Sequence, residues 1–468
     1  MANTQKLLRL IKENNLQHHP QIQKLLEAGI ATDNDQKQKT IRKLIELHAA
    51  KQLKKPFTET TPDTSLLDKP IILGKTRNHC QTYAIPEESL TRHILTNGAT
   101  GTGKTTLHLN ILNQLTTPYW IFDRKQDYRH LTQQQDNLLV LPWHRVRFNP
   151  LQPPQGVGPA QWAMSISEIL SHSTDLLSGS RNYVLTHIIE LYKQYNLFDE
   201  HSSPYPTLLD LEELIQSDKV NYVRKTSNYR DTVLSRLEPM TEVTRPVFNC
   251  SRHYPYENLI QRNMVFEFEG LDRDIQNFIQ ESIFAYLYHY LSQNGFRGKG
   301  LHLVLVWDEA KKAFSYKKEQ SDAAGIPEMD DLTAKAREFG LSLMVSDQES
   351  TKLTESIKAN TETKVLLRPS DYNQLSSMAD SMGLDELQRS YAFNLDVGQA
   401  IVKHAGCRPV PVDTRDFDLD KNVSDEDLRR SQEEQWESLD YSLRDRDPLE
   451  KGSSSGSEGV DLSDYLKK

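Results

Sequence analysis

Residues 93–109 read HILTNGATGTGKTTLHL, which predicts a short apolar strand, a glycine-rich loop and the start of a helix. The loop has the spacing G-x-x-x-x-G-K-[ST], with Gly98, Gly103, Lys104 and Thr105 at the fixed positions. Glycines let the backbone turn its N–H groups towards phosphate oxygens, and the helix that follows adds the positive end of its dipole. We therefore expect a phosphate-binding loop, and its expected nucleotide contacts are Gly98, Ala99, Thr100, Gly101, Thr102, Gly103, Lys104, Thr105 and Thr106.

Two side chains of this loop have distinct expected roles. Lys104 would reach the β- and γ-phosphates of a nucleoside triphosphate, and the Thr105 hydroxyl would bind Mg²⁺. The segments on either side of the loop fit this prediction. Ile94 and Leu95 can form the strand before it, and leucines and isoleucines between residues 107 and 115 can form the buried face of the helix after it. ATP and Mg²⁺ are therefore the expected cofactors.

A second motif lies at residues 301–309, LHLVLVWDE, where an apolar strand ends in two acidic residues. In nucleotide hydrolysis the first acid can hold Mg²⁺, and the second can polarise the attacking water. Asp308 is thus the expected metal ligand together with Thr105, and Glu309 is the expected catalytic base. A phosphate-binding loop upstream makes this interpretation much stronger than an acidic strand end alone.

Further apolar segments predict the other strands of an α/β fold. They lie at 71–73, 82–85, 119–122, 138–141, 264–268, 341–345 and 364–368, with a closing hairpin at 397–402 and 408–412. Gln348 follows the strand at 341–345, where a polar side chain can sense a γ-phosphate. Ligands bind at the carboxyl ends of strands in open α/β sheets, so these strand ends are the expected site.

The composition along the chain predicts six parts. The nucleotide-binding core is expected at 70–161 and 264–412, with a helical insertion at 162–263. Residues 1–55 predict a helical segment, which could contact DNA or a partner or could be a solvated appendage, and 56–69 predict a linker. Residues 413–468 predict an acidic, disordered tail, whose end could bind a partner or stay unbound.

The charge is uneven. The chain of 468 residues has a formal net charge of −9, yet residues 1–55 hold 11 basic and 5 acidic residues, against 9 basic and 17 acidic in 411–468. Overall acidity therefore does not exclude nucleic acid, which binds to local basic surfaces. Two basic clusters could contact DNA or could be ordinary solvated faces: Lys311, Lys312, Lys317 and Lys318, and Arg224, Lys225 and Arg230.

Cysteine usage and hydropathy indicate the compartment. Cys80, Cys250 and Cys407 lie far apart without metal-site spacing, which favours a reducing, intracellular environment. No apolar run approaches the roughly 18–20 residues that span a membrane. We expect a cytoplasmic protein without direct membrane insertion.

The order of the motifs resembles one superfamily. Lys104 and Asp308 lie 204 positions apart, much farther than in simple phosphate-loop folds. A strand followed by Asp-x-Lys, a helical insertion, the acidic strand, and Arg-x-Phe-Gly before a strand ending in Gln is a specific order. It resembles the HerA/FtsK superfamily of ring-forming, DNA-translocating ATPases, especially HerA and the soluble core of TraG-type conjugation ATPases. The resemblance covers roughly residues 71–412.

The resemblance implies a RecA-like core in a homohexameric ring, with duplex DNA in the central channel and ATP between subunits. It makes Gln348 the sensor glutamine. The segment 336–340, AREFG, is similar to the family's Gly-Arg-Lys-Tyr-Gly, so Arg337 is the first candidate for an arginine finger. Arg368 is the second, although a structural salt bridge is an equally good interpretation of that residue.

The implied function is an ATP-driven DNA translocase or helicase of the HerA type, working with a nuclease or other effector in DNA processing or anti-phage defence. The chain has no nuclease motif of its own. One alternative is a conjugation or secretion ATPase that energises DNA or protein transfer, and another is a ring that ATP only orders as a scaffold for an effector. Two departures stand out: HerA proteins usually begin with a β-barrel, and FtsK and TraG-type proteins usually carry transmembrane helices.

Overall fold

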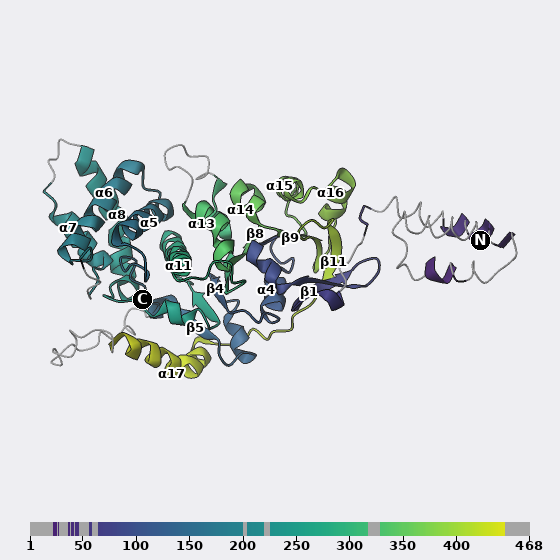
Figure 1. The fold of residues 1–468 in the computed structure, drawn as a ribbon, viewed down its shortest axis with the longest axis horizontal. Helices are drawn as coiled ribbons and strands as arrows, with labels where there is room; N and C mark the ends of the chain where they lie inside the picture. Colours follow the sequence, from purple (N-terminus) through teal and green to yellow (C-terminus); the bar gives the residue numbers. More distant parts are fainter. Residues whose placement is uncertain are drawn as a thin grey trace. The chain divides into compact units, whose positions relative to one another are not determined.

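The computed structural model describes residues 64–199, 204–219, 225–316 and 328–444, together with short stretches between residues 22 and 58. Most of the helical segment expected at 1–55, and residues 445–468 of the expected tail, lie outside this description. The chain forms two compact units (Figure 1). Unit 1 takes its described residues from Met1–Asp123 and Phe296–Asp420, and unit 2 from Arg124–Gly295 and Lys421–Lys468.

Unit 1 is built on a mixed sheet with the strand order β2-β1-β11-β10-β9-β3-β8-β7-β4. Strands β9, β3, β8, β7 and β4 are parallel, and the others pair antiparallel. The bounds are β1 Pro70–Thr76, β2 Thr82–Pro86, β3 Ile94–Asn97, β4 Tyr119–Asp123, β7 Leu303–Asp308, β8 Leu341–Asp347, β9 Thr363–Leu367, β10 Gln399–Lys403 and β11 Val410–Thr414. The predicted α/β fold is confirmed.

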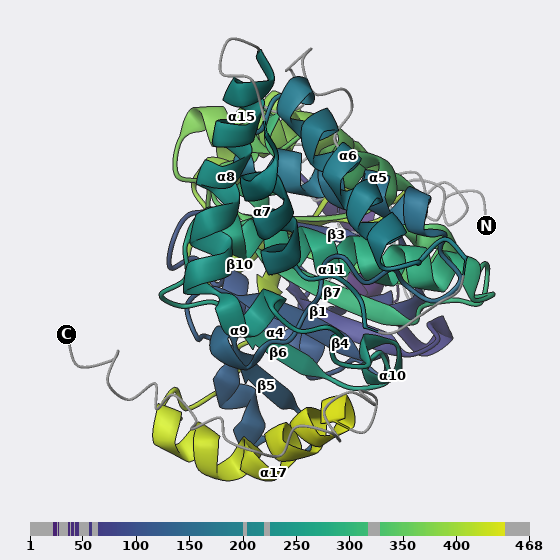
Figure 2. The same ribbon diagram turned by 90° about the vertical axis from the view of Figure 1, so that its left-hand side faces the viewer.

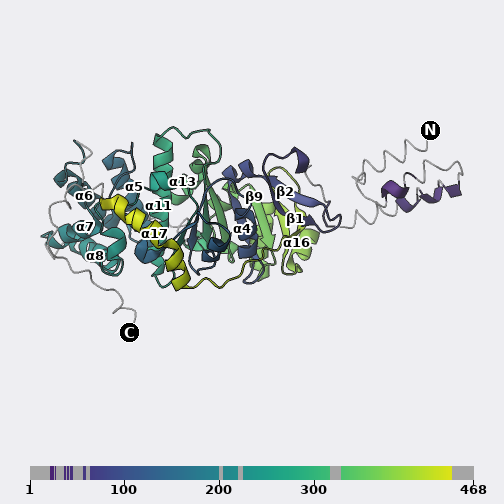
Figure 3. The same cartoon turned by 90° about the horizontal axis from the view of Figure 1, so that it is seen from below.

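The parallel strands are apolar because both faces of the sheet are covered. Side chains of β3 and β7 such as Leu95 and Leu305 are fully buried, as expected for parallel strands packed between helices. Helices α4 Lys104–Leu112, α13 Glu328–Ala336 and α14 Glu355–Asn360 belong to this unit. Figure 3 gives a second view of α4 with β1, β2 and β9.

The register brings the ends of these strands to one edge. Asn97 of β3 pairs with Asp347 of β8 on one side and with Leu366 of β9 on the other. Asp308 of β7 pairs with Ser346 of β8. The segments that follow β3, β7, β8 and β9 therefore begin at the same carboxyl edge of the sheet, where ligands bind in this class of fold.

The helices of unit 1 that were not predicted from the sequence include two with aspartate caps. They are α15 Tyr372–Met382 and α16 Glu386–Phe393. Each begins with an aspartate cap: Asp371 accepts from the N–H of Gln374, and Asp385 forms a capping box with Gln388. An Asp-x-x-Gln pattern is a sequence signal for a helix start, so these helices could have been predicted.

Unit 2 is mostly helical (Figure 2). Its two strands, β5 Leu139–Pro142 and β6 Met264–Glu267, pair in parallel. The helical insertion expected at 162–263 lies within this unit, which also contains β5, β6 and two further helices. The helices are α5 Pro159–Thr174, α6 Ser178–Gln194, α7 Leu208–Ser217, α8 Lys225–Val243, α9 Arg245–Phe248, α10 Tyr256–Leu259, α11 Arg273–Gln293 and α17 Asp425–Arg444.

Helix α17 corrects the expectation that the chain is disordered from residue 413. Residues 413 and 414 belong to β11, and 425–444 form one helix beside β5 (Figure 2). Leu428, Trp436 and Leu439 recur at helical spacing and are buried. The acidic composition of the segment hid this periodicity, because the acidic residues form the solvated face of an amphipathic helix.

Side chains of α17 also bond to the backbone of β5. The Gln432 side chain accepts from the N–H of Val140 and donates to the carbonyl of Leu138, both at 3.1 Å. The indole N–H of Trp436 donates to the carbonyl of Val140 at 2.8 Å. These bonds replace those of a neighbouring strand, so backbone groups along this edge of β5 are satisfied.

Candidate active site

The predicted strand, loop and helix are present around the phosphate loop, residues 98–106. Gly101 and Gly103 have φ values of 73° and 104°, in the region that glycine adopts without steric cost. At Gly98 the reason for glycine is space, because an added Cβ would lie 2.7 Å from the Cβ of Leu367. The end of β9 thus leaves no room for a larger residue at the start of the loop.

Lys104 is the first residue of α4, and its ammonium group lies against the phosphate loop. The Nζ atom donates to the carbonyl oxygens of Gly98 and Ala99 at 2.8 and 2.9 Å. Phosphate oxygens of a bound nucleotide would compete for the same donors. Thr105 and Thr106 occupy the first turn of the helix, where backbone N–H groups and the dipole favour an anion.

Asp308 ends β7, two strands away from the phosphate loop, or about 10 Å at the usual strand spacing. Its Oδ1 atom accepts from the N–H of Glu309 at 3.0 Å and from the hydroxyl of Ser346. In the part of the chain that the structure describes, both side-chain hydrogen bonds to Asp308 end on Oδ1. A carboxylate oxygen and the Thr105 hydroxyl are hard oxygen donors of the kind that Mg²⁺ prefers, so this donor set fits that ion.

Glu309 has an unusual backbone conformation. Its φ and ψ are 54° and 49°, in the left-handed region that residues with a Cβ rarely adopt. Such a conformation costs on the order of 1 kcal/mol and persists only where the surroundings fix it, often at functional sites. The half-buried Glu309 is therefore held in a specific turn directly after Asp308, the last residue of β7.

Asp347 is a residue of the site that the sequence did not single out. Its carboxylate is buried and accepts three main-chain N–H groups, from Lys311, Gln348 and Glu349, at 2.7, 2.7 and 2.8 Å. Burial raises the pKa of this carboxyl, while the bonds from these N–H groups act in the opposite direction. Asp347 thus joins the segment after β7 to the segment after β8. This role is visible only once the pairing of β7 with β8 is known.

Gln348, the predicted sensor, is brought to the phosphate loop. The hydroxyl of Thr100 donates to its Oε1 atom at 2.8 Å. This contact joins the loop after β3 to the segment after β8.

His108 is a second buried residue near the site without a sequence signal. It lies on α4, and its Nε2 atom is 3.2 Å from the hydroxyl of Thr96. Burial lowers the pKa of this imidazole to about 4, and the charge of Lys104 also lowers it, although Asp308 acts in the opposite direction. At neutral pH the ring is uncharged and adds no positive charge beneath the phosphate loop.

The two candidate arginines lie at opposite ends of the parallel strands: Arg368 at the carboxyl ends and Arg337 at the amino ends. Arg368 follows β9, its carbonyl accepts from the N–H of Ala99 at 2.9 Å, and its side chain is exposed. Arg337 lies in the 3-10 helix η6 Arg337–Phe339 before β8, and is also exposed. The seven residues of β8 span about 23 Å at 3.3 Å per residue, so Arg337 cannot reach the phosphate loop of its own chain.

The basic clusters are only partly described. Lys311 forms an ion pair with Glu349, and Arg230 forms one with Asp231 at 3.2 Å. Residues 224, 317 and 318, and the side chains at 225 and 312, lie outside the description. A role of these two clusters in DNA binding therefore stays a prediction.

Two negative findings apply to the described ranges alone. No helix there is both long and apolar enough to cross a membrane. Within the same ranges no group of three or more His, Cys, Asp or Glu side chains could hold a metal ion. The three cysteines form no disulfide, and Cys250 is half-buried while Cys80 and Cys407 are exposed.

Comparisons with known proteins agree with this geometry. The family model of the helicase HerA central domain matches residues 73–285, which include the phosphate loop. VirB4 of Thermoanaerobacter pseudethanolicus has the same fold, with a TM-score of 0.59 and 16% identity over 77% of this chain and 99% of that chain. The chain resembles HerA/FtsK-type P-loop ATPases. The resemblance predicted from the sequence is therefore confirmed.

Structures of the plasmid coupling protein TrwB have the same fold. The complex with ADP and Mg²⁺ has a TM-score of 0.54 and 16% identity, over 75% of this chain and 90% of that chain. The complex with the non-hydrolysable ATP analogue ADPNP has a TM-score of 0.55 and 15% identity, over 75% and 91%. No curated protein sequence matches the chain. The RecA-like core expected for HerA/FtsK-type ATPases is present, and the matches support an ATPase of this type.

Proposed function

We propose that this protein is a Mg²⁺-dependent ATPase of the HerA type that couples hydrolysis to movement along duplex DNA. The observation that carries the proposal is the meeting of two motifs at one edge of the sheet. The phosphate loop follows β3, and at the same edge Asp308 ends β7 and Glu309 follows it. The hydrogen bond from Thr100 to Gln348 joins the phosphate loop to the segment after β8, the strand between β3 and β7.

Each residue has a role that its chemistry allows. Lys104 and the N–H groups of the phosphate loop bind the phosphates and offset negative charge as the terminal phosphoryl group leaves. Thr105 and Asp308 would hold Mg²⁺, which when bound neutralises phosphate charge. Glu309 orients a water molecule and accepts its proton. Gln348 reports the state of the terminal phosphate through Thr100.

The arginine positions favour an assembly. Arg337 lies too far from its own phosphate loop, so it can complete a site only in a neighbouring subunit, as a ring would allow. We propose a homohexamer with duplex DNA in its channel, held through phosphate contacts that depend on salt. Arg368 lies beside its own loop and would act within the same subunit.

The first experiment measures steady-state ATP hydrolysis with and without linear duplex DNA. Lys104→Ala should abolish turnover, while Lys335→Ala, which removes a surface lysine paired with Asp331, should not change it. Glu309→Gln should lower kcat by at least about 100-fold while ADP still binds. A several-fold stimulation by DNA that disappears at high salt supports the translocase. Turnover that depends on Lys104 but ignores DNA at low salt would refute it.

Mixing variants tests the arginine. Arg337→Ala and Glu309→Gln should each be inactive alone, and their mixture should recover part of the activity, because mixed rings contain sites with both native residues. No recovery, with native-like assembly of both variants, would exclude Arg337 as a finger in trans. The same assay with Arg368→Ala should show no recovery by mixing with Glu309→Gln, since both residues would belong to one subunit's site.

A second candidate function is supported by the matches to VirB4 and to the conjugative coupling protein TrwB. In that case the ATPase would energise transfer of DNA or protein and would need recruitment to a membrane complex.

A ring that serves only as a scaffold for an effector predicts effector activity that survives Glu309→Gln. A nuclease or other effector as partner, and a role in defence, follow only from the likeness to HerA, and co-purification from the native cell tests them.

A further inference from the structure

The carboxyl edge of the sheet in unit 1 has two sides around the phosphate loop. β8 and β7 lie on one side of β3 and carry Gln348, Asp308 and Glu309, whereas β9 and β10 lie on the other. Hydrolysis acts on the terminal phosphate, so that phosphate must face the acidic side. With the proposed roles of these acids, the phosphate chain of ATP would run away from them, and the nucleoside would leave the loop towards β9 and β10.

A tight turn, residues 396–399, occupies that other side. β10 runs antiparallel to β9, so its first residue lies at the same edge as the carboxyl end of β9. The N–H of Gly398 donates to the carbonyl of Thr102 at 3.4 Å, and a Cβ added at Gly103 would be 4.0 Å from the same nitrogen. The turn therefore touches the phosphate loop next to Lys104, although about 295 residues separate them in sequence.

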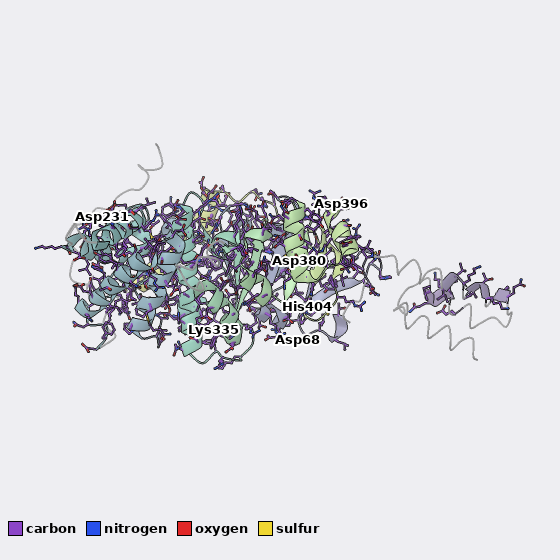
Figure 4. All side chains as sticks on the ribbon, turned by 90° about the horizontal axis from the view of Figure 1, so that it is seen from above. Asp68, Asp231, Lys335, Asp380, Asp396 and His404 are labelled. Carbon is purple, nitrogen blue, oxygen red and sulfur yellow. The ribbon has the colours of Figure 1, made fainter. Side chains whose placement is uncertain are left out.

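The turn is held from both ends. The N–H of Asp396 donates to the side chain of Gln399 at 2.9 Å, and the N–H of Gln399 donates back to the carbonyl of Asp396 at 3.2 Å. The carbonyl of Gly398 accepts from the N–H and the hydroxyl of Thr414 at 2.8 and 2.9 Å. Such a turn is already ordered, so a ligand that contacts it pays little conformational entropy. Asp396 is labelled in Figure 4 at the surface of unit 1.

The side chain at the tip of this turn is apolar and exposed. Val397 is 60% exposed, and Phe393, at the end of α16 four residues earlier, is 46% exposed. Isolated exposed apolar residues are common on surfaces. Here, however, the exposed valine sits on a rigid turn that bonds to the phosphate loop. Ligand sites for flat aromatic groups combine such an apolar surface with few polar contacts.

We propose that the 396–399 turn is the base platform of the site, on which Val397 packs against the face of the adenine of ATP. The proposal rests on the proposed function, because it needs a nucleotide held by the phosphate loop. It assigns the turn a role in affinity for the base, separate from the phosphate contacts of Lys104. Phe393 lies four residues before Val397, at the end of α16.

The test separates base contacts from phosphate contacts. Binding of ADP and of inorganic tripolyphosphate is measured by calorimetry for the native full-length protein and for Val397→Asp, Val397→Ala and Val397→Phe. Covering one valine side chain corresponds to about a five- to tenfold change in affinity. Val397→Asp should therefore weaken ADP at least fivefold and weaken tripolyphosphate less, because its charge also repels phosphate. Val397→Ala should weaken ADP by a smaller factor and leave tripolyphosphate unchanged, and Val397→Phe should bind ADP as tightly as the native protein or more tightly.

The matched control is Val243→Asp, which places the same charge at a valine that is 56% exposed in α8 of unit 2. It should bind both ligands like the native protein. Unchanged ADP affinity in Val397→Asp would overturn the platform, including the case in which that variant alters only the oligomeric state. An equal loss of both ligands would also overturn it, since the turn would then act through the phosphate loop. If the native protein binds neither ligand, the nucleotide proposal itself fails and the platform with it.

Discussion

The buried carboxylate of Asp347 gives the sharpest prediction, because one isosteric change tests whether it organises the site. In Asp347→Asn one acceptor oxygen becomes an NH₂ donor. The native Oδ1 accepts from Gln348 and Glu349, and Oδ2 accepts from Lys311. The amide oxygen can keep the first pair, but the NH₂ group then faces the N–H of Lys311, donor against donor.

The expected cost follows from these three bonds. A hydrogen bond to a charged group contributes about 1.5–3 kcal/mol, and a buried donor left without an acceptor adds its desolvation cost. The two remaining bonds also weaken when the acceptor loses its charge. We therefore expect the segments after β7 and β8 to lose about 2–4 kcal/mol of local stability, which is about 30- to 1,000-fold in the opening equilibrium.

The assay is hydrogen–deuterium exchange of peptides that cover β7 and β8, combined with steady-state ATP hydrolysis. Exchange should accelerate in these peptides, because it reports local opening, and kcat should fall while ADP affinity stays within a few-fold. Asp371→Asn is the matched control. Asp371 also accepts backbone N–H groups, at the exposed start of α15, where asparagine is as good a cap as aspartate.

The result that refutes this reasoning is simple to recognise. If Asp347→Asn matches Asp371→Asn in exchange of β7 and β8 and in kcat, Asp347 does not hold the two segments together. If ADP affinity collapses along with kcat, the carboxylate acts on the phosphate loop, whose Gly98 N–H bonds to the carbonyl of Asp347 at 3.3 Å, and the proposed division of roles is wrong.

Two further predictions concern buried charge. Arg129 pairs with Glu267 in unit 2, and their side chains are only 5% and 2% exposed. Arg129→Met should lower the free energy of unfolding, measured in urea, by about 3–5 kcal/mol, and the double variant Arg129→Met with Glu267→Met should recover most of this loss. A double variant as unstable as the single one would contradict this expectation. His108 has a pKa lowered from 6.5 to about 4, so its neutral form stabilises the fold above pH 6.5, and this stability is lost as the pH falls from 6.5 towards 4. In that window His108→Asn should reduce the pH-dependent change in the free energy of unfolding, measured by urea denaturation, by on the order of 3 kcal/mol. An unchanged pH dependence would count against this role of His108.

Several parts of the protein were predictable because their signals are local. The glycines, Lys104 and Thr105 are contiguous, and a loop between a strand and a helix needs only nearby residues to set its backbone. The apolar strand before Asp308 and Glu309 is equally local, since buried parallel strands have continuous apolar runs. Helix α17 was also predictable from the helical spacing of Leu428 and Trp436. The acidic composition of the segment as a whole concealed this pattern.

The sequence by itself thus determined the type of fold, the phosphate loop and the acidic pair, because each is written in consecutive residues. Only the tertiary structure decided which distant segments meet at the carboxyl edge of the sheet. It placed Asp347 between two loops, Gln348 on Thr100, and Val397 beside the phosphate loop, and it put Arg337 at the far end of β8. These placements depend on strand order and register, which arise from long-range pairing that no short stretch of sequence encodes.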